Sequence, residues 1–343
     1  MTERFVGFQL KNLGDVLMTL PALALLKKHR PKAGVTMVVR PQTAQLLENH
    51  PLIDEVISHS FQPRKLNTLK TMRLAKKLRQ SRFSAAFHFD GQQRGGILAL
   101  LARIPFRSVG VGLLGVSGLK RPFLYNQKIL LRPVSAPWES LALSHQRLVA
   151  LSLGLEVEPD IPVPGLTLPP AALEKAQSLI QTLPGNGPLI GLTLKGRQRE
   201  KSWPLEYWAE VATVLKERLK ARFYVTGEES DKVLAVTLAQ LVGFDIGNFC
   251  GLTSLREFVA LAGASDLFLT IDTGSAHLVS TTSTPLVTIF TATNPVQWGP
   301  LARKQARICY HWALARFGLE RGPFIGCPVV KPPDVIKAAL SLL

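Results

Sequence analysis

The feature that most constrains the fold is a regular alternation of short apolar runs with longer helical segments. In the first half of the chain, strands are predicted over residues 5–10, 34–40, 55–59 and 85–90, and helices over residues 16–29, 44–49, 66–82 and 92–102. Strands that alternate with helices in this way indicate βαβ units and a mostly parallel sheet. The sequence therefore predicts an α/β fold.

The alternation stops at a proline-rich segment and then starts again. Residues 160–165, followed by Pro169 and Pro170, are the best candidate for a linker. Beyond them, helices are predicted over residues 172–183, 204–219 and 334–343, and strands over residues 189–194, 222–227, 266–271 and 285–290. A length of 343 residues also favours two domains. We expect one domain over residues 1–165 and a second over residues 166–343.

Residues 270–278 combine a strand end with a glycine turn and a short helix. Residues 273–275 are expected where that helix begins, and free backbone N–H groups at a helix start suit a phosphate. Asp272 would end its strand where open α/β sheets place ligands. An ordinary capped turn, with His277 in the core, explains the same spacing equally well.

Positive charge is concentrated in the first half of the chain. The formal net charge is +17, which favours a polyanionic partner or surface. Residues 1–165 hold 23 Lys and Arg against 10 Asp and Glu, which leaves +13 in that half. The first half is therefore expected to meet most of the anion.

Asp15 is a candidate for chemistry, because it follows Gly14 at a predicted strand-to-helix turn. Its carboxylate either caps the helix or acts as a general base that faces a cleft. Spacing alone does not separate these two roles.

The helix predicted over residues 66–82 lies in a strongly basic segment, and Leu66, Leu69, Leu74 and Leu78 supply its apolar side. The cations of this segment are Arg64, Lys65, Lys70, Arg73, Lys76, Lys77, Arg79 and Arg82. A solvated amphipathic helix is the commoner explanation, and an anionic membrane surface is the more specific one. No aromatic residue lies among these cations, which disfavours a platform for nucleic-acid bases.

Two loops at predicted strand ends are charged. Residues 195–201 carry four cations, which indicate either a phosphate site or a solvated loop. Glu228 and Glu229 either complement a helix dipole or bind ribose hydroxyls. Residues 110–115 match G-x-G-x-x-G, but Pro122 follows soon after, so we expect a glycine-rich loop and no dinucleotide site.

Cysteine usage and hydropathy place the protein in a reducing compartment. Cys250, Cys309 and Cys327 show no metal-binding spacing and are typical of free thiols. The N-terminus lacks the apolar core of a signal peptide, and the apolar runs within residues 257–303 are only strand-length. We expect a soluble cytoplasmic protein, in contact with a membrane from that side.

Four motifs follow one another along nearly the whole chain. They are GDVL at 14–17 with TLPAL at 19–23, KSWP at 201–204, DTGSAHL at 272–278, and a closing segment from Thr284-Pro285 through Asn294-Pro295 to WGP at 298–300. In this order they resemble the signatures of glycosyltransferase family 9, the ADP-heptose:lipopolysaccharide heptosyltransferases.

The resemblance implies a GT-B fold, in which two Rossmann-like domains face a cleft. The first domain would bind the acceptor, the anionic inner core of lipopolysaccharide on lipid A, at the cytoplasmic face of the inner membrane. Candidate acceptor residues are Gly14, Lys70, Arg73 and Arg94. The second domain would bind a nucleotide-sugar donor, typically ADP-heptose. Candidate donor residues are Arg197, Glu228, Glu229, Asp272, Thr273, Gly274, Ser275 and His277.

The resemblance also implies an inverting mechanism that needs neither a metal nor a cofactor. Asp15 would deprotonate the acceptor hydroxyl as general base. Lys201 and the backbone N–H groups of residues 273–275 would stabilise the charge that develops on the departing ADP. The sequence has no D-x-D pair, in agreement with metal independence.

Two segments depart from the family pattern. Residues 291–293 (TAT) stand where a Gly-Pro-Thr-like turn is common, and residues 280–283 (STTS) replace an alanine-rich run. Another donor sugar or a different acceptor therefore stays open. A non-catalytic envelope-assembly or polyanion-binding protein is the alternative of a different class. Only charge favours nucleic acid, and no binding motif supports it, so we expect no nucleic-acid partner.

Overall fold

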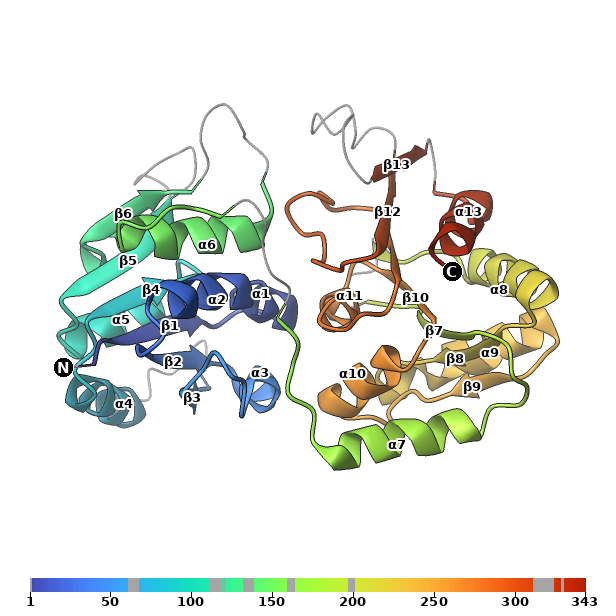
Figure 1. Cartoon of the computed structure of the whole chain (residues 1–343), viewed down its shortest axis with the longest axis horizontal. Helices are drawn as coiled ribbons and strands as arrows, with labels where there is room; N and C mark the ends of the chain where they lie inside the picture. The colour runs from blue at the N-terminus through green and yellow to red at the C-terminus, as the bar shows by residue number, and fades with distance from the viewer. Residues whose placement is uncertain are drawn as a thin grey trace. The chain divides into compact units, whose positions relative to one another are not determined.

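The computed structural model describes residues 2–60, 68–111, 119, 121–131, 139–158, 164–196, 201–310, 324–327 and 330–343. The chain divides into two compact units, Met1–Thr167 and Leu168–Leu343. Each unit is built on its own parallel sheet (Figure 1). The α/β class with two Rossmann-like units is therefore confirmed.

Over the described residues, the sheet of the first unit has six parallel strands in the order β3-β2-β1-β4-β5-β6. The strands are β1 Arg4–Gln9, β2 Gly34–Val39, β3 Glu55–Ser58, β4 Ala85–His88, β5 Phe106–Val111 and β6 Gln127–Leu130. β1 pairs with β2 on one side and with β4 on the other. The winding therefore reverses between β1 and β4, and ligands in open α/β sheets bind outside the carboxyl ends of such a strand pair.

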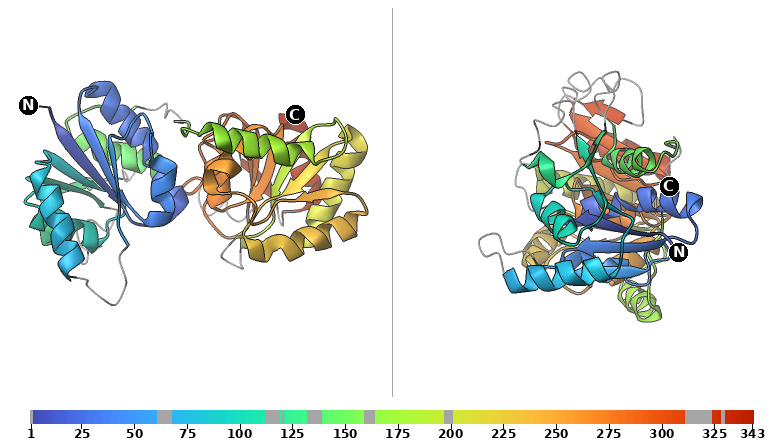
Figure 2. Two further views of the ribbon diagram at one scale, coloured as in Figure 1. Left: turned by 90° about the horizontal axis from the view of Figure 1, so that it is seen from below. Right: turned by 90° about the vertical axis from the view of Figure 1, so that its left-hand side faces the viewer.

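Helices cover both faces of this sheet (Figure 2). They are α1 Leu13–Leu17, α2 Leu20–His29, α3 Pro41–Leu47, α4 Thr68–Gln80, α5 Gln93–Leu101 and α6 Leu141–Ser152, with a 3₁₀ turn at Pro122–Leu124. α2 packs on α6, and α4 packs on α5. The single helix predicted over residues 16–29 is in fact α1 followed by α2. Pro21 lies in the first turn of α2, where its missing N–H has no consequence.

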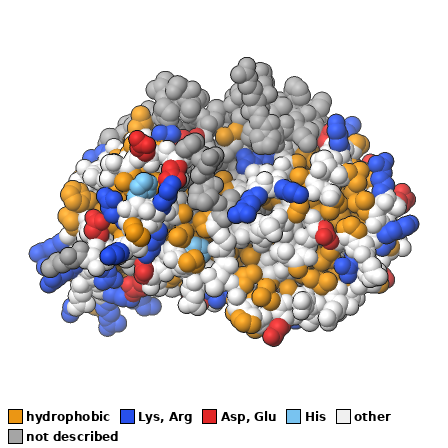
Figure 3. Space-filling model, viewed as in Figure 1, with side chains coloured by type: hydrophobic (Ala, Val, Ile, Leu, Met, Phe, Trp, Pro, Cys, Tyr) orange, Lys and Arg blue, Asp and Glu red, His pale blue; other side chains and the backbone are white. Residues whose placement is uncertain are grey.

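The basic helix α4 is held to the sheet by its apolar side. Leu74, Ala75 and Leu78 are buried, and most of the other side chains are exposed. Lys and Arg side chains gather at the lower left of Figure 3, where Figure 1 places α4. Arg64 and Lys65 of the predicted basic segment lie outside the described residues.

In the part of the chain that the structure describes, the sheet of the second unit has seven parallel strands in the order β13-β12-β11-β10-β7-β8-β9. The strands are β7 Leu189–Thr193, β8 Arg222–Val225, β9 Ile246–Asn248, β10 Leu267–Ile271, β11 Leu286–Phe290, β12 Gln305–Tyr310 and β13 Phe324–Cys327. β7 pairs with β8 on one side and with β10 on the other. The winding here reverses between β7 and β10, which marks their carboxyl ends as the ligand edge.

The helices of the second unit again lie on both faces. They are α7 Pro170–Gln181, α8 Leu205–Leu219, α9 Lys232–Val242, α10 Leu255–Gly263, α11 Gly274–Val279 and α13 Pro332–Leu342, with a 3₁₀ turn at Glu229–Asp231. α8 packs on α9 and α13, and α10 packs on α7 (Figures 1 and 2).

Three helices begin earlier than the sequence pattern predicts. α3, α7 and α13 start at Pro41, Pro170 and Pro332, two or three residues before the apolar periodicity becomes visible. Proline suits the first helical turn, because its fixed φ is helical and the N–H that it lacks would have no partner there. The predictions stopped at the periodic residues and missed this start signal.

Of the described strands, β5, β6, β9, β12 and β13 were not predicted, and β6, β9 and β13 lie at sheet edges. β9 has only three residues, all half-buried. The predicted glycine-rich loop over residues 110–115 is partly wrong, because Gly110 and Val111 belong to β5. The rest of that loop lies outside the described residues. Short strands with polar and glycine residues give a weak apolar signal.

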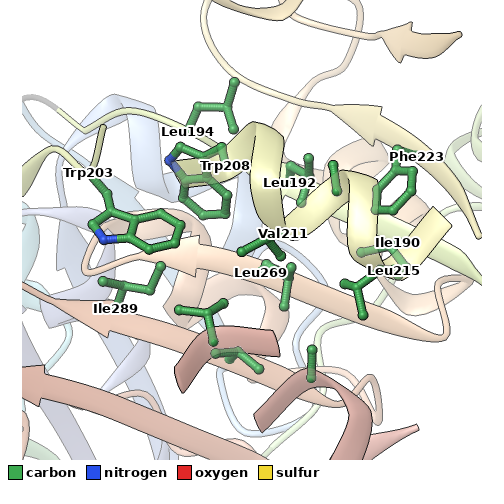
Figure 4. Packing of buried hydrophobic residues seen from close by; sticks show 14 of the residues in the cluster. Ile190, Leu192, Leu194, Trp203, Trp208, Val211, Leu215, Phe223, Leu269 and Ile289 are labelled. Carbon is green, nitrogen blue, oxygen red and sulfur yellow. The ribbon is translucent and has the colours of Figure 1, made fainter. Parts of the chain in front are cut away.

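The core of the second unit lies between α8 and the sheet (Figure 4). Trp208, Val211 and Leu215 of α8 pack over the apolar residues of the central strands. The nearby Trp203 donates its indole N–H to the Val330 carbonyl oxygen over 2.9 Å. This bond offsets the cost of removing the indole N–H of Trp203 from water. The ring thus ties the segment before α8 to the segment before α13.

Leu215→Ala is expected to lower the free energy of unfolding by about 2–5 kcal/mol, because it leaves a cavity in a close-packed core. Leu215 is 0% exposed. Leu241→Ala is the matched control, since Leu241 is 50% exposed, and its effect should stay within about 0.5–1 kcal/mol. Urea unfolding followed by circular dichroism measures both, and equal losses would contradict the assigned core.

Candidate active site

Three loops meet at the carboxyl edge of the second sheet. Asp272 follows β10, Lys201 lies between β7 and α8, and Thr293 follows β11. Lys201 Nζ is 2.6 Å from Asp272 Oδ2, and the Thr293 hydroxyl donates a hydrogen bond to the same oxygen. The Lys201 side chain is 18% exposed and that of Asp272 is 6% exposed. The cluster is therefore a nearly buried ion pair, with its cation on the more open side.

The turn after Asp272 is capped as the sequence indicates. Thr273 is the N-cap of α11, and its hydroxyl accepts the Ser275 N–H at 3.1 Å. The Asp272 N–H donates to the Ile289 carbonyl over 3.0 Å, which fixes the turn to β11. Gly196, after β7, passes close by, since a Cβ built on it would lie 3.0 Å from Thr273 Cγ2. The predicted helix cap is therefore present. A phosphate site at the same turn stays a prediction.

His277 lies under this turn in a buried position. Burial lowers its pKa to about 4, and the positive charges of Arg307 and Lys201 act in the same direction against the attraction of Asp272. The imidazole is therefore neutral at physiological pH, and it offers one N–H donor and one acceptor nitrogen.

A buried arginine holds the loop that carries Thr293. Arg307 of β12 donates from Nη1 to the Pro295 carbonyl over 2.9 Å and from Nη2 to the Pro300 carbonyl over 2.6 Å. Burial lowers its pKa to about 10, so it stays charged. Gly299 is required beside it, because a Cβ there would lie 2.3 Å from the guanidinium carbon. The loop of residues 291–300 is thus anchored on β12.

The Asp231 side chain contacts the segments that follow β7 and β8. Its carboxylate accepts the Glu228 N–H over 2.9 Å and lies 3.4 Å from Lys195 Nζ. Glu228 and Glu229 themselves are exposed, and Glu229 pairs with Lys232 at 2.7 Å. Arg197, the remaining predicted donor residue, lies outside the described residues. The two glutamates and the Lys201 cluster occupy loops of the same sheet edge.

Asp15 is half-buried near the carboxyl end of β1. It stands at the third position of α1, and its Oδ2 accepts the Asn12 N–H over 3.1 Å. Burial raises the pKa of Asp15, against the charges of Lys11 and Arg40 and the Asn12 hydrogen bond. The carboxylate does therefore cap a helix. Its raised pKa is also what a general base near neutral pH requires.

A second carboxylate, which the sequence analysis did not select, lies at the same edge. Asp90 follows β4 and accepts the Leu10 N–H and the Gln92 N–H, each at 2.8 Å. It therefore ties the end of β1 to the end of β4, at the point where the winding reverses. Burial also raises its pKa. The sequence did hold a signal for Asp90 as a candidate site residue, because it is the last residue of a predicted strand.

The remaining predicted acceptor residues lie on three helices. Gly14 is buried in α1 beside Asp15, Lys70 and Arg73 lie on the exposed side of α4, and Arg94 is in the first turn of α5. α4 and α5 each lead into the next parallel strand, so both begin at the carboxyl edge of the sheet. These cations therefore lie toward the same edge as Asp15.

Within the described ranges, no group of three or more His, Cys, Asp or Glu side chains could hold a metal ion. Over those same ranges, no helix has both the length and the apolar character needed to cross a bilayer. Cys250 is a buried free thiol, and the side chains of Cys309 and Cys327 are not described.

Comparison with known proteins gives consistent matches. The model of glycosyltransferase family 9 (heptosyltransferase) matches residues 71–318. A lipopolysaccharide core heptosyltransferase of Haemophilus influenzae is 24% identical over 294 residues, which covers 85% of this chain and 80% of the relative.

Solved structures show the same fold. The glycosyltransferase family 9 protein of Veillonella parvula superposes with a TM-score of 0.82 at 22% identity and covers 99% of this chain and 97% of its own. The ADP-heptose lipopolysaccharide heptosyltransferase II of Escherichia coli gives a TM-score of 0.75 at 19% identity, with 99% and 98% covered. Because the family model spans most of the chain, this protein belongs to glycosyltransferase family 9, the heptosyltransferases.

Proposed function

We propose that this glycosyltransferase moves heptose from ADP-heptose to the inner core of lipopolysaccharide, with inversion and without a metal. The observation that carries the proposal is the cluster of Lys201, Asp272 and Thr293 at the edge where the second sheet reverses its winding. The names of two similar proteins support the substrates, since one is a lipopolysaccharide core heptosyltransferase and the other an ADP-heptose lipopolysaccharide heptosyltransferase.

In the proposed donor site, Lys201 faces the diphosphate. Its ammonium is held by Asp272, so it is positioned before the substrate binds, and such preorganised charge stabilises a transition state effectively. The N–H groups of Thr273 and Gly274 add donors, and His277 supplies a neutral imidazole. The Ser275 N–H is already donated to the Thr273 hydroxyl, so Ser275 would contribute its own hydroxyl. Glu228, Glu229 and Arg197 complete the proposed set. Carboxylates on this edge suit ribose hydroxyls, which donate hydrogen bonds to them.

In the proposed reaction, Asp15 takes the proton of the acceptor hydroxyl. The hydroxyl oxygen forms a bond to the anomeric carbon of heptose while the bond to the ADP oxygen breaks. ADP leaves with the electron pair of that bond, and Lys201 offsets its charge. Gly14, Lys70, Arg73 and Arg94 are the proposed acceptor residues of the first unit. Their three cations suit a phosphorylated core oligosaccharide.

We further propose that the protein acts at the cytoplasmic face of the inner membrane, because its acceptor would be a lipid. No nucleic acid is expected as a partner. A different nucleotide sugar or acceptor is the alternative within the same fold and mechanism. The thermal-shift panel described next separates these choices.

The function is tested first by thermal shift with ADP, ADP-heptose, UDP, GDP and a short oligonucleotide. A ligand that binds only the native protein raises Tm, and the rise grows with the ratio of the ligand concentration to its Kd. We expect ADP and ADP-heptose alone to raise Tm at millimolar concentration. A shift with UDP or GDP instead would change the donor, and a response to the oligonucleotide alone would overturn the enzyme proposal.

In the same assay, Lys201→Met is expected to weaken ADP binding by about 10–100-fold, because a charge-assisted contact of about 1.5–3 kcal/mol is lost. Lys337→Met is the matched control, since Lys337 is exposed on α13. Equal ADP affinity in both variants would remove Lys201 from the donor site.

Asp15→Asn is expected to lower kcat by about 10²–10⁴-fold, the usual contribution of a general base. The wild-type kcat/KM should fall as the pH drops through the raised pKa of Asp15, because protonation removes the base, and this acidic limb should disappear in the variant. Asp54→Asn is the control: Asp54 accepts the Val35 N–H away from the ligand edge. Normal turnover in Asp15→Asn would leave Asp15 as a helix cap only.

Arg307→Met is expected to lower the free energy of unfolding by about 1–3 kcal/mol, since two buried carbonyls lose their donor. It should also raise the KM for the donor, because the loop that carries Thr293 loses its anchor. Arg307→Lys should recover part of both losses. Urea unfolding and steady-state kinetics measure them, and an unchanged KM with lowered stability would limit Arg307 to a structural role.

A further inference from the structure

Helix α4 presents two large apolar side chains to solvent on its outer face. Leu69 is 69% exposed and Met72 is 55% exposed. They are three residues apart, so they lie side by side on one face of the helix. Two adjacent exposed apolar side chains on a helix that already has a buried apolar side need a separate explanation.

This outer face lies opposite the face that packs on the sheet. At 100° per residue, Leu69, Met72, Arg73 and Lys76 fall within one narrow stripe, and the buried Leu74 and Leu78 lie on the far side. The core of the first unit includes Leu74, Ala75 and Leu78. The stripe is therefore not a misplaced core face, because the core contacts of α4 are already made.

The apolar pair is surrounded by positive charge. Residues 68–82 carry six cations and no Asp or Glu, and Lys70, Arg73, Lys76 and Arg79 are all exposed. Lys77 on the flank pairs with Glu55 at 2.7 Å. Lys and Arg around a small apolar surface are typical of helices that lie on an anionic bilayer, where the cations meet headgroups and the apolar side chains enter the interface.

We propose that the outer face of α4, formed by Leu69, Lys70, Met72, Arg73, Lys76 and Arg79, docks on the surface of an anionic lipid bilayer. α4 begins at the carboxyl edge of the first sheet, the edge that carries Asp15, so docking there brings the bilayer toward the proposed acceptor site. The proposal rests on the proposed function in one respect, that the acceptor is a lipid of the same bilayer.

The side chains of this face favour a bilayer over a nucleic acid. Leu69 and Met72 have no ring with which to stack on a base, and none of residues 68–82 is aromatic. A phosphate backbone would use the cations and leave the apolar pair in water. A bilayer uses both kinds of side chain.

The test is sedimentation of the full chain with vesicles of 30% phosphatidylglycerol in phosphatidylcholine, which contain no lipopolysaccharide. Wild-type binding is expected, and it should weaken as salt rises. Lys76→Gln/Arg79→Gln should bind roughly 25-fold more weakly, at about fivefold per cation. Leu69→Ser/Met72→Ser should bind about tenfold more weakly.

Matched controls lie on the second unit. Arg218→Gln/Lys337→Gln removes two exposed cations, and Val233→Ser/Val236→Ser removes an exposed apolar pair with the same spacing on α9. Both controls should bind the vesicles as the wild type does. If the controls lose as much affinity as the α4 variants, or if the α4 variants lose none, the proposal is overturned.

A turnover assay separates lipid docking from acceptor recognition. Leu69→Ser/Met72→Ser should keep its kcat/KM for a water-soluble, delipidated core acceptor and lose about tenfold for the same acceptor embedded in vesicles. An equal loss with both acceptors would assign Leu69 and Met72 to contact with the acceptor itself and overturn the proposal. Vesicle binding without any sugar transfer by the wild type would overturn the proposed function and leave the lipid surface standing.

Discussion

The structure of the candidate donor site depends on a carboxylate that is almost completely removed from water. An ionised Asp272 at that depth is stable only beside a positive charge and with hydrogen bonds to its carboxylate. Lys201 and Thr293 meet this need, and they come from the segment after β7 and the loop after β11. One buried carboxylate thus connects three loops. Arg307 extends the connection to β12 by holding the carbonyls of Pro295 and Pro300.

In the first unit, the carboxylates at the sheet edge are stabilised by backbone N–H groups. Asp90 accepts hydrogen bonds from two backbone N–H groups and so links the chain after β1 to the chain after β4. Asp15, on the next turn, keeps one oxygen on the Asn12 N–H. Both pKa values are raised by burial. A parallel sheet places these groups together because all its strands end at one edge, and because the reversal of winding leaves that edge uncovered between two central strands.

The sequence identified the polar residues of the candidate donor site that match family motifs, and it missed those that do not match them. Lys201, Asp272 and the capped turn were found because they stand in short, ordered signatures. Thr293 and Arg307 were missed, since a threonine after a strand and an arginine within a short strand carry no local signal. Residues 291–293 had been taken only as a departure from the family pattern. In the structure, the hydroxyl of Thr293 donates to Asp272, so this segment is part of the polar cluster.

The sequence by itself determined the α/β class, the central strands and most helices, because apolar periodicity and proline or glycine positions are local properties. It also marked the basic helix. Only the tertiary structure decided which of its residues face outward, because the sequence pattern places Leu69 and Leu74 alike in the apolar set and packing buries just one of them. Likewise, 71 residues separate Lys201 from Asp272. Their pairing follows from the adjacency of β7 and β10, which strand order alone creates.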